Sequence, residues 1–261
     1  MTIKIIIVIL ALCAIYFFIK VIRSKLVENY SNEVTVVTAA SSNHFKSSIQ
    51  LLTSLKNFPV ITRIVYYDLG LTNEEIENIK KYESIVYKKF NYELYPDYFD
   101  VTKNAGEYAW KPTIIDMVSK EYGGILLWTD SGNIFNDNFN DLISTIKTNN
   151  LYSSTTSGNI KDWTFPKTLE YLKTKDSFLS LPNRNGACIG FNLNTDWVKN
   201  LIYDWKKCAA TKECIAPTGS NRSNHRQDQA VFSILYYKYH YKYNFNIINE
   251  YIGFSIHNDI D

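Results

Sequence analysis

The sequence lacks the features that mark several large functional classes. Among its 261 residues, Lys and Arg exceed Asp and Glu by only two charges, and no basic stripe stands out. Nucleic acid is therefore not an expected partner. No Gly-x-x-x-x-Gly-Lys-Ser/Thr phosphate loop occurs, which argues against an ordinary kinase, and no Cys/His cluster has zinc spacing. No internal repeat or low-complexity stretch is present, so a single folded domain is expected.

Cysteine is also scarce, with four in the whole chain. Cys13 lies in an apolar run near the N-terminus, and Cys188 stands alone in the sequence. Cys208 and Cys214 enclose a short polar loop and can form a small disulfide in an oxidising lumen. Two free thiols in a reducing compartment are the alternative, and the residues themselves leave both interpretations open.

What the chain does have is one long apolar run near its N-terminus. Residues 5–19 are apolar without interruption, and the flanking Lys4 and Lys20 can extend the span by directing their charges outward. The resulting length suits a bilayer crossing. A cleaved signal peptide is the competing interpretation, but no small-x-small cleavage site follows the run. We expect a membrane anchor over residues 5–22, within an N-terminal anchor and linker of residues 1–32.

The charges beside this run bear on its orientation. Three basic residues at positions 20–25 follow it, whereas only Lys4 precedes it. By the positive-inside rule, this asymmetry favours a cytoplasmic main domain. A disulfide between Cys208 and Cys214 would favour the opposite side of the membrane. The two observations conflict.

Beyond residue 32 the hydrophobic pattern alternates between strands and helices. Strands are predicted at residues 34–37, 61–67, 84–90, 125–129 and 186–192, and helices starting near residues 42, 73, 111, 138, 195 and 225. Thr72 and Thr195 are predicted as N-caps, and Pro112 as the first residue of its helix. This alternation predicts an α/β domain over residues 33–261, with a mainly parallel sheet and helices on both faces.

A polar stretch directly follows the predicted strand at residues 125–129. It begins with Asp130 and continues through Ser131, Gly132 and Asn133. In an open α/β sheet, ligands bind beyond the carboxyl ends of the strands. A carboxylate there can hold Mg²⁺ or Mn²⁺ against the phosphates of a nucleotide sugar, and Gly132 would let the ligand approach the backbone. An Asp that merely caps the following turn is the alternative structural interpretation.

Two later stretches combine small or polar residues with an apolar element. Small residues interrupt the strand at 185–192, which indicates close packing against a ligand or another backbone, or simply a turn. Residues 225–229, His-Arg-Gln-Asp-Gln, open the last long helix beside a polar loop at 218–223. The helix dipole alone favours Asp228 in a first turn. The same groups could also bind a hydroxylated acceptor.

Taken in order, these segments resemble the GT-A type glycosyltransferases. The matching stretches are residues 34–38, 67–70, 110–112, 127–130, 185–186 and 228–229. The nearest look-alikes are family 8 enzymes and a less well characterised, membrane-anchored group related to them. The segment from residue 205 to residue 229 is the most specific match to that second group. The resemblance covers roughly residues 33–240.

The resemblance implies a GT-A fold and transfer of a sugar from a nucleotide-diphosphate sugar to a glycan, protein or lipid acceptor. It supports the disulfide between Cys208 and Cys214 and with it a lumenal domain. We therefore expect a single-pass, type II membrane protein whose catalytic domain lies in the Golgi or endoplasmic reticulum lumen, or an equivalent extracytoplasmic space.

On the nucleotide side, the resemblance assigns roles to four residues. Thr38 and Ala39, at the end of the first strand, would line the nucleotide pocket. Asp68 lies where such enzymes contact the base or ribose. Lys111, at a helix start, would neutralise phosphate charge.

On the sugar side, the resemblance implies roles for two pairs of residues. Asn185 and Gly186 match a stretch near the sugar and acceptor. Asp228 and Gln229 match a pair beside the transferred sugar. Asp228 would serve as a base in an inverting reaction or as an orienting group in a retaining one.

The sequence departs from the family at its metal motif. Asp130 matches the first Asp of Asp-x-Asp, but Gly132 replaces the second. Mn²⁺ or Mg²⁺ would then rest on Asp130 with Asn133 or with a distant residue such as His257, or would not bind at all. This departure motivates an alternative function, a catalytically inactive GT-A-like lectin or assembly subunit of a glycosylation complex.

Overall fold

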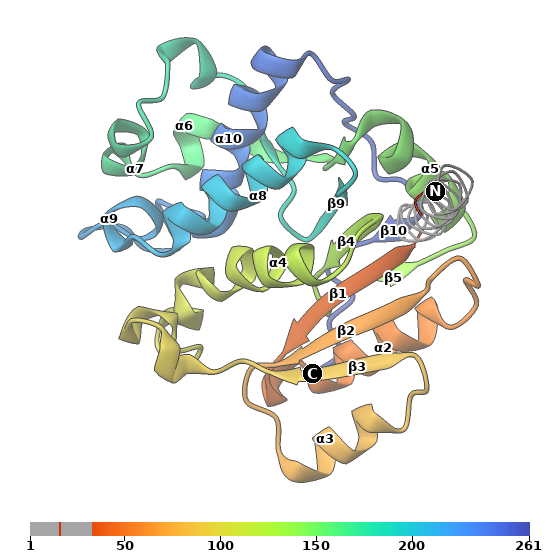
Figure 1. Ribbon diagram of the computed structural model, residues 1–261. Helices are drawn as coiled ribbons and strands as arrows, with labels where there is room; N and C mark the ends of the chain where they lie inside the picture. The colour runs from red at the N-terminus through yellow and green to blue at the C-terminus, as the bar shows by residue number, and fades with distance from the viewer. Residues whose placement is uncertain (1–15, 17–32) are drawn as a thin grey trace, which may run out of the picture.

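The computed structural model describes residue 16 and residues 33–261 (Figure 1). Apart from Tyr16, the membrane anchor expected over residues 5–22 lies outside the described residues. Within the described part of the chain, no helix combines the length and apolarity that a membrane crossing needs.

A six-stranded sheet in the order β3-β2-β1-β4-β9-β6 forms the centre of the domain. Its strands are β1 (Val34–Ala40), β2 (Arg63–Asp68), β3 (Ile85–Lys89), β4 (Ile125–Thr129), β6 (Leu151–Tyr152) and β9 (Cys188–Asn192). The first four run parallel, whereas β9 is antiparallel to both β4 and β6. The mainly parallel sheet is thus confirmed, and all five predicted strands form.

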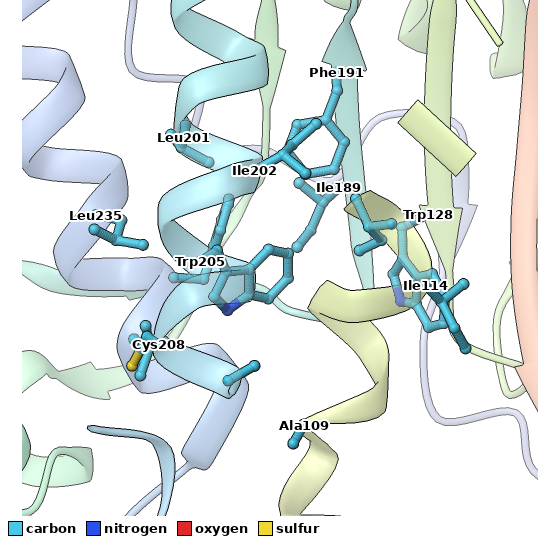
Figure 2. Packing of buried hydrophobic residues seen from close by; sticks show 14 of the residues in the cluster. Ala109, Ile114, Trp128, Ile189, Phe191, Leu201, Ile202, Trp205, Cys208 and Leu235 are labelled. Carbon is cyan, nitrogen blue, oxygen red and sulfur yellow. The ribbon is translucent and has the colours of Figure 1, made fainter. Parts of the chain in front are cut away.

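Helices cover both faces of this sheet, as predicted (Figure 1). One face carries α4 (Trp110–Glu121), α8 (Asp196–Ala209) and α10 (Gln227–Tyr243); the other carries α2 (Phe45–Leu55), α3 (Asn73–Lys80) and α5 (Phe139–Asn149). Successive side chains of a strand point to opposite faces. Leu126 and Trp128 therefore join the α4/α8/α10 core, which Figure 2 shows, while Ile125 and Leu127 join the other.

The helix starts agree with the sequence in part. Thr72 caps α3 as predicted: its side chain accepts a hydrogen bond from the Glu75 N–H, and the Glu75 carboxylate accepts one from Thr72 N–H. Pro112 was predicted as the first helical residue and is the third residue of α4, where its missing N–H still falls in the first turn. Thr195 precedes α8, but its hydroxyl donates to Asn150 Oδ1 instead of capping the helix.

The sequence did not predict the elements that carry the chain between β6 and β9. They are β7 (Thr155–Asn159), α6 (Ile160–Trp163), α7 (Pro166–Tyr171) and β8 (Pro182–Arg184), with β7 and β8 paired antiparallel. Also unpredicted are α9 (Lys212–Ile215), β5 (Ile134–Phe135), β10 (Phe254–Ser255) and the short 3-10 turns η1 (Ser42–His44), η2 (Tyr92–Leu94), η3 (Asp97–Phe99), η4 (Asn104–Tyr108) and η5 (Asp176–Phe178). Antiparallel pairing of β10 with β5 brings the C-terminal segment back beside the end of β4.

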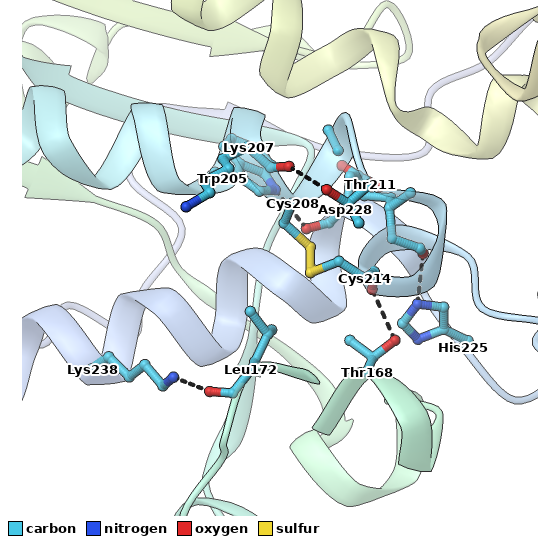
Figure 3. The surroundings of a disulfide bond; sticks show 12 residues. Thr168, Leu172, Trp205, Lys207, Cys208, Thr211, Cys214, His225, Asp228 and Lys238 are labelled. Atoms are coloured by element: carbon cyan, nitrogen blue, oxygen red, sulfur yellow. Dashed lines mark hydrogen bonds between the residues drawn. A yellow bond between two sulfur atoms is a disulfide. The ribbon is translucent and has the colours of Figure 1, made fainter. Parts of the chain in front are cut away.

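A disulfide joins Cys208, near the end of α8, to Cys214 in α9 (Figure 3). Of the two alternatives for these cysteines, a disulfide or two free thiols, the structure contains the disulfide. The Cys214 carbonyl accepts a hydrogen bond from Thr168, and the Ile215 carbonyl lies 2.9 Å from His225 Nε2. The disulfide therefore lies beside the contacts that hold the loop before α10 in place. Cys188 is free and buried.

The small residues of β9 serve helix packing at one position. A Cβ added to Gly190 would lie 2.2 Å from Cδ1 of Ile146, so the absence of a side chain lets α5 lie close against the sheet. At Gly190, therefore, the close neighbour is a helix side chain and not a ligand.

Replacing Gly190 with Ala should lower the free energy of unfolding by about 1–3 kcal/mol, because the added methyl group overfills this contact. Urea denaturation measures the change. Adding Ile146→Ala should recover part of the loss, so that the double variant is less destabilised than the sum of the two single variants. Strictly additive effects would contradict this packing account.

Candidate active site

Two adjoining cavities open where the parallel strands β1 and β4 end and β9 begins. The outer cavity, of about 500 Å³, is lined by residues of the β1 and β4 ends and of the C-terminal segment. The inner cavity, of about 300 Å³, is lined by the start of α10 and the segment before β9. Tyr108, Asp130, Arg222 and His257 line both, so the two cavities are continuous.

A larger hollow of about 870 Å³ lies elsewhere, between α2, α3 and the start of β3. Its lining is largely aliphatic and aromatic, and Glu83 is the one carboxylate that it contains. It therefore offers no pair of carboxylates and no histidine for chemistry. The strand-end cavities agree with the rule that ligands of open α/β sheets bind beyond the carboxyl ends of the strands.

Lys111 stands at the centre of these cavities and is 5% exposed. Its Nζ lies 3.1 Å from Asp130 Oδ1 and 3.1 Å from Asp228 Oδ2, and it donates a 3.3 Å hydrogen bond to the Gly186 carbonyl. The Trp128 ring lies beside the ammonium group, with 5.5 Å between Nζ and the ring centroid. The Lys111 side chain thus connects the C-terminal end of β4, the N-terminal end of α10 and the segment before β9.

The charges of this group depend on one another. Burial alone would lower the pKa of Lys111, but the carboxylates of Asp130 and Asp228 raise it above its ordinary value. Burial raises the pKa of Asp228, and Lys111 opposes that rise. Lys111 therefore stays protonated and supplies a fixed positive charge. It cannot act as a general base.

Asp130 is held by one of its two carboxylate oxygens. Trp128 Nε1 donates a 2.8 Å hydrogen bond to Oδ1, the same oxygen that faces Lys111. The side chain is 39% exposed, which leaves Oδ2 available to a ligand. In the turn that follows, Asn133 N–H donates to the Asp130 backbone carbonyl and not to its side chain. The carboxylate therefore does not cap that turn.

The structure brings most of the predicted site residues together. Asn185, Gly186, Asp228 and Gln229 line the inner cavity with Lys111. A Cβ at Gly186 would lie 3.3 Å from Cβ of Gln229, so this segment packs closely on the start of α10. On the outer side, Ala39 lines the cavity at the end of β1.

Two predicted residues lie away from both cavities. Thr38 is fully buried within β1 and lines neither. Asp68 is buried, and both of its oxygens are engaged: Oδ1 accepts from the Gly70 and Leu71 N–H groups, and Oδ2 accepts from the Tyr87 hydroxyl. Asp68 thus shapes the turn after β2, where Leu69 lines the outer cavity in its place.

The turn that precedes α4 was not predicted from the sequence. Five successive residues, 104–108, have positive φ, although only Gly106 and, to a lesser degree, Asn104 favour that conformation. A Cβ at Gly106 would lie 2.3 Å from the Phe99 carbonyl oxygen. This turn places Tyr108 between the two cavities, where its ring contacts both Lys111 and Arg222. Strained backbone of this kind is concentrated at ligand sites.

Arg222 is a second cation that sequence reasoning missed. It is exposed, lines both cavities, and rests on the Tyr108 ring with 5.3 Å between the guanidinium carbon and the ring centroid. Within residues 33–261 it forms no ion pair with a carboxylate. Its charge is therefore available to an anionic ligand.

The residues near Asp130 offer oxygen and imidazole ligands of the kind that Mn²⁺ accepts. His257 lines both cavities with Asp130, and Asp259 lines the outer one. The carboxylate of Asp259 fills the space beside Gly132 that a side chain there would occupy. The chemistry of this donor set suits a divalent cation, but among the described residues the ligand atoms that lie within 4.8 Å of one another are those of His44, Asp259 and Asp261. The Asn133 amide nitrogen is already hydrogen-bonded to Thr129 and to the Ala187 carbonyl.

Solved glycosyltransferases share this fold. The bifunctional glycosyltransferase WbbM, in its apo form, superposes with a TM-score of 0.52 at 12% identity over 79% of this chain, which spans only 38% of that protein. The galactosyltransferase LgtC, solved with donor and acceptor sugar analogues, gives 0.50 at 14% identity over 77% of this chain and 70% of LgtC. Core-mannan synthase A from Aspergillus fumigatus, in its Mn/GDP form, gives 0.51 at 11% identity over 79% of this chain and 72% of that protein.

The similarity in sequence to a known family covers a smaller part of the chain. Residues 18–116 match the family described as Protein of unknown function (DUF1647). No curated protein matches the chain. The structural likeness shows that the chain has the GT-A glycosyltransferase fold.

Replacing Lys111 with Met leaves two carboxylates without their shared cation. We expect the free energy of unfolding to fall by about 3–5 kcal/mol near pH 8. Without Lys111 the pKa of Asp228 rises further, and an Asp whose pKa is raised in the folded state contributes stability that is lost as the pH rises through that pKa. The penalty should therefore be smaller near about pH 5 than near about pH 8.

Urea denaturation of both proteins at the two pH values measures this difference. Lys199→Met, which removes an exposed ammonium group whose partner Asp196 is also exposed, is the control. An equal penalty at both pH values would contradict the account of the Asp228 charge.

Proposed function

We propose that the chain transfers a glycosyl group from a nucleoside-diphosphate sugar to an acceptor hydroxyl. The observation that carries this proposal is the ion triad of the buried Lys111 and Asp228 with the partly exposed Asp130 on the floor of the strand-end cavities, in a GT-A fold. Burying Lys111 and Asp228 costs folding free energy. A site that used them for binding would explain why they are retained.

The outer cavity suits the nucleotide. Its lining joins Ala39 and Ala40 at the end of β1 to Asp130 at the end of β4. Arg222 lies at its boundary with the inner cavity, where the diphosphate of a donor would lie if the sugar entered the inner cavity. The guanidinium group, free of any carboxylate among the described residues, can stabilise the negative charge that develops on that diphosphate.

The inner cavity suits the sugar and the acceptor. In the proposed reaction the bond between the sugar C1 and the diphosphate oxygen breaks, and a bond from C1 to the acceptor oxygen forms. The acceptor proton passes to a base and the nucleoside diphosphate leaves. Asp228, held by Lys111 beside Gly186 and Gln229, is placed to orient the sugar hydroxyls or to take that proton.

Asp130, His257 and Asp259 are the residues that would hold a divalent cation. Such a cation, Mn²⁺ or Mg²⁺, supplies positive charge to the leaving diphosphate when bound. The acceptor in this proposal is a glycan, a protein or a lipid.

The proposal extends to the placement of the chain. We propose that residues 5–22 anchor it in a membrane as a type II protein, with the GT-A domain in the lumen of the secretory pathway or an equivalent extracytoplasmic space. The disulfide between Cys208 and Cys214 supports this side of the membrane, because disulfides persist in oxidising compartments.

The full-length chain should slowly hydrolyse at least one nucleoside-diphosphate sugar of a representative panel, with water in place of the acceptor. Asp130→Asn should reduce turnover by about 100-fold or more, because the variant keeps a partner for Trp128 but loses the charge at the donor site. Asp141→Asn, an exposed carboxylate on α5, is the matched control and should leave turnover unchanged.

Unchanged turnover in Asp130→Asn, with an intact circular dichroism spectrum, would refute this site assignment. Calorimetry tests the inactive-subunit alternative. That alternative predicts no affinity for any nucleoside diphosphate with or without Mn²⁺, whereas the transferase predicts binding.

In sealed microsomes made from cells that express the full-length chain, we expect the domain to resist added protease. It should become sensitive once detergent opens the vesicles. Digestion of the domain in intact vesicles would contradict the type II placement.

A further inference from the structure

Gly132 lies where the Asp-x-Asp motif has its second Asp, and another carboxylate fills the space beside it. A Cβ at position 132 would lie 2.5 Å and 2.6 Å from the two carboxylate oxygens of Asp259. The φ of Gly132 is outside the positive range, so the backbone there would accept any L-residue. A side chain at position 132 would therefore displace the flexible Asp259 carboxylate without straining the backbone.

Asp259 reaches this place through contacts of the backbone. Strand β10 pairs antiparallel with β5, with Ser255 opposite Ile134. Three residues later, Asn258 N–H donates a 2.9 Å hydrogen bond to the Gly132 carbonyl. The segment that carries His257 and Asp259 is thus bound to the chain directly after Asp130.

We propose that Asp259 supplies the carboxylate that position 132 lacks, and that it binds a divalent cation together with Asp130 and His257. This inference rests on the proposed function, because it assigns the donor-site cation of that function to residues of this chain. Asp130 presents its free Oδ2, and all three side chains line the outer cavity. Carboxylate and imidazole ligands suit Mn²⁺.

A neighbouring group could compete for the same cation. His44, Asp259 and Asp261 have ligand atoms within 4.8 Å of one another, and all three lie at the surface. Asp261, however, already caps α2: its carboxylate accepts hydrogen bonds from Lys46 N–H at 2.7 Å and Ser47 N–H at 3.2 Å. Asp259 caps no helix, but its Oδ1 lies 3.6 Å from His44 Nδ1, so a cation bound with Asp130 and His257 requires the Asp259 carboxylate to turn away from His44.

Binding of Mn²⁺ alone to the full-length chain in detergent tests the proposal, with electron paramagnetic resonance reporting the free ion. Asp259→Asn and Asp130→Asn should each weaken Mn²⁺ affinity by about tenfold or more. Asp137→Asn, an exposed carboxylate in the turn between β5 and α5, is the matched control and should bind as the wild type does.

Substitutions at position 132 test the same proposal more specifically, with the same Mn²⁺-binding measurement. Gly132→Ala should displace the flexible Asp259 carboxylate, and so lose Mn²⁺ affinity while the urea midpoint stays unchanged. The losses in Gly132→Ala and Asp259→Ala should not add in the double variant, because both remove the same ligand. The double variant Gly132→Asp with Asp259→Ala should recover affinity, because it returns the carboxylate to position 132.

The inference is wrong if Asp259→Asn binds Mn²⁺ with the affinity of the wild type, or if the wild type binds no Mn²⁺. It is also wrong if His44→Ala and Asp261→Asn lose affinity for Mn²⁺ while Asp130→Asn does not. Hydrolysis of a nucleoside-diphosphate sugar in excess chelator, combined with absent Mn²⁺ binding, would refute this inference and leave the proposed function standing. Mn²⁺ binding as described without any nucleotide affinity would refute the function instead.

Discussion

The contact of one buried ammonium group with two carboxylates organises this site. Lys111 reaches Asp130 and Asp228 from the first turn of α4, and those partners lie 19 and 117 residues further along the chain. A buried cation without its partners would be costly, so the ends of β4, α4 and α10 have to meet at one point. The same contact holds the Gly186 carbonyl and with it the segment that enters β9. The geometry of the inner cavity follows from it.

Several features of the surrounding fold maintain this contact. The turn at residues 104–108 keeps an unfavourable backbone conformation and places Tyr108 beside Lys111. The disulfide of Cys208 and Cys214 and the contact of His225 with Ile215 support the loop before α10 (Figure 3). Trp205, deep in the core, donates to the Asp228 carbonyl. Rigid support of this kind lets charged groups act without reorganising when a ligand binds.

Much of the sheet could be predicted from the sequence, since its buried strands form short apolar runs between turn residues. The position of Asp130 followed from the same pattern, because it comes directly after such a run. Helix ends were less predictable. Thr72 carries the full capping box, whereas the role of Thr195 depends on Asn150, which is distant in the sequence. The segment from residue 151 to residue 185 consists of short elements that no periodicity reveals.

The site was predictable only where its residues adjoin regular elements. Lys111, Asp228 and Gly186 were found in this way. That Asp228 and the Gly186 carbonyl both contact the ammonium group of Lys111 was not predicted. Thr38 and Asp68 were assigned by position in the chain, and the structure shows Thr38 in the core and Asp68 in a turn. Arg222 and Asp259 lie in irregular segments, and no local pattern connects Asp259 with Gly132. That connection exists because β10 pairs with β5.

A crystal structure of the protein with a bound nucleoside diphosphate would show directly whether the strand-end cavities hold the donor. We expect density in the outer cavity, with the nucleoside against Ala39 and Ala40 and the diphosphate between Asp130 and Arg222. A nucleotide bound in the hollow between α2 and α3, or bound away from Asp130, would contradict this expectation.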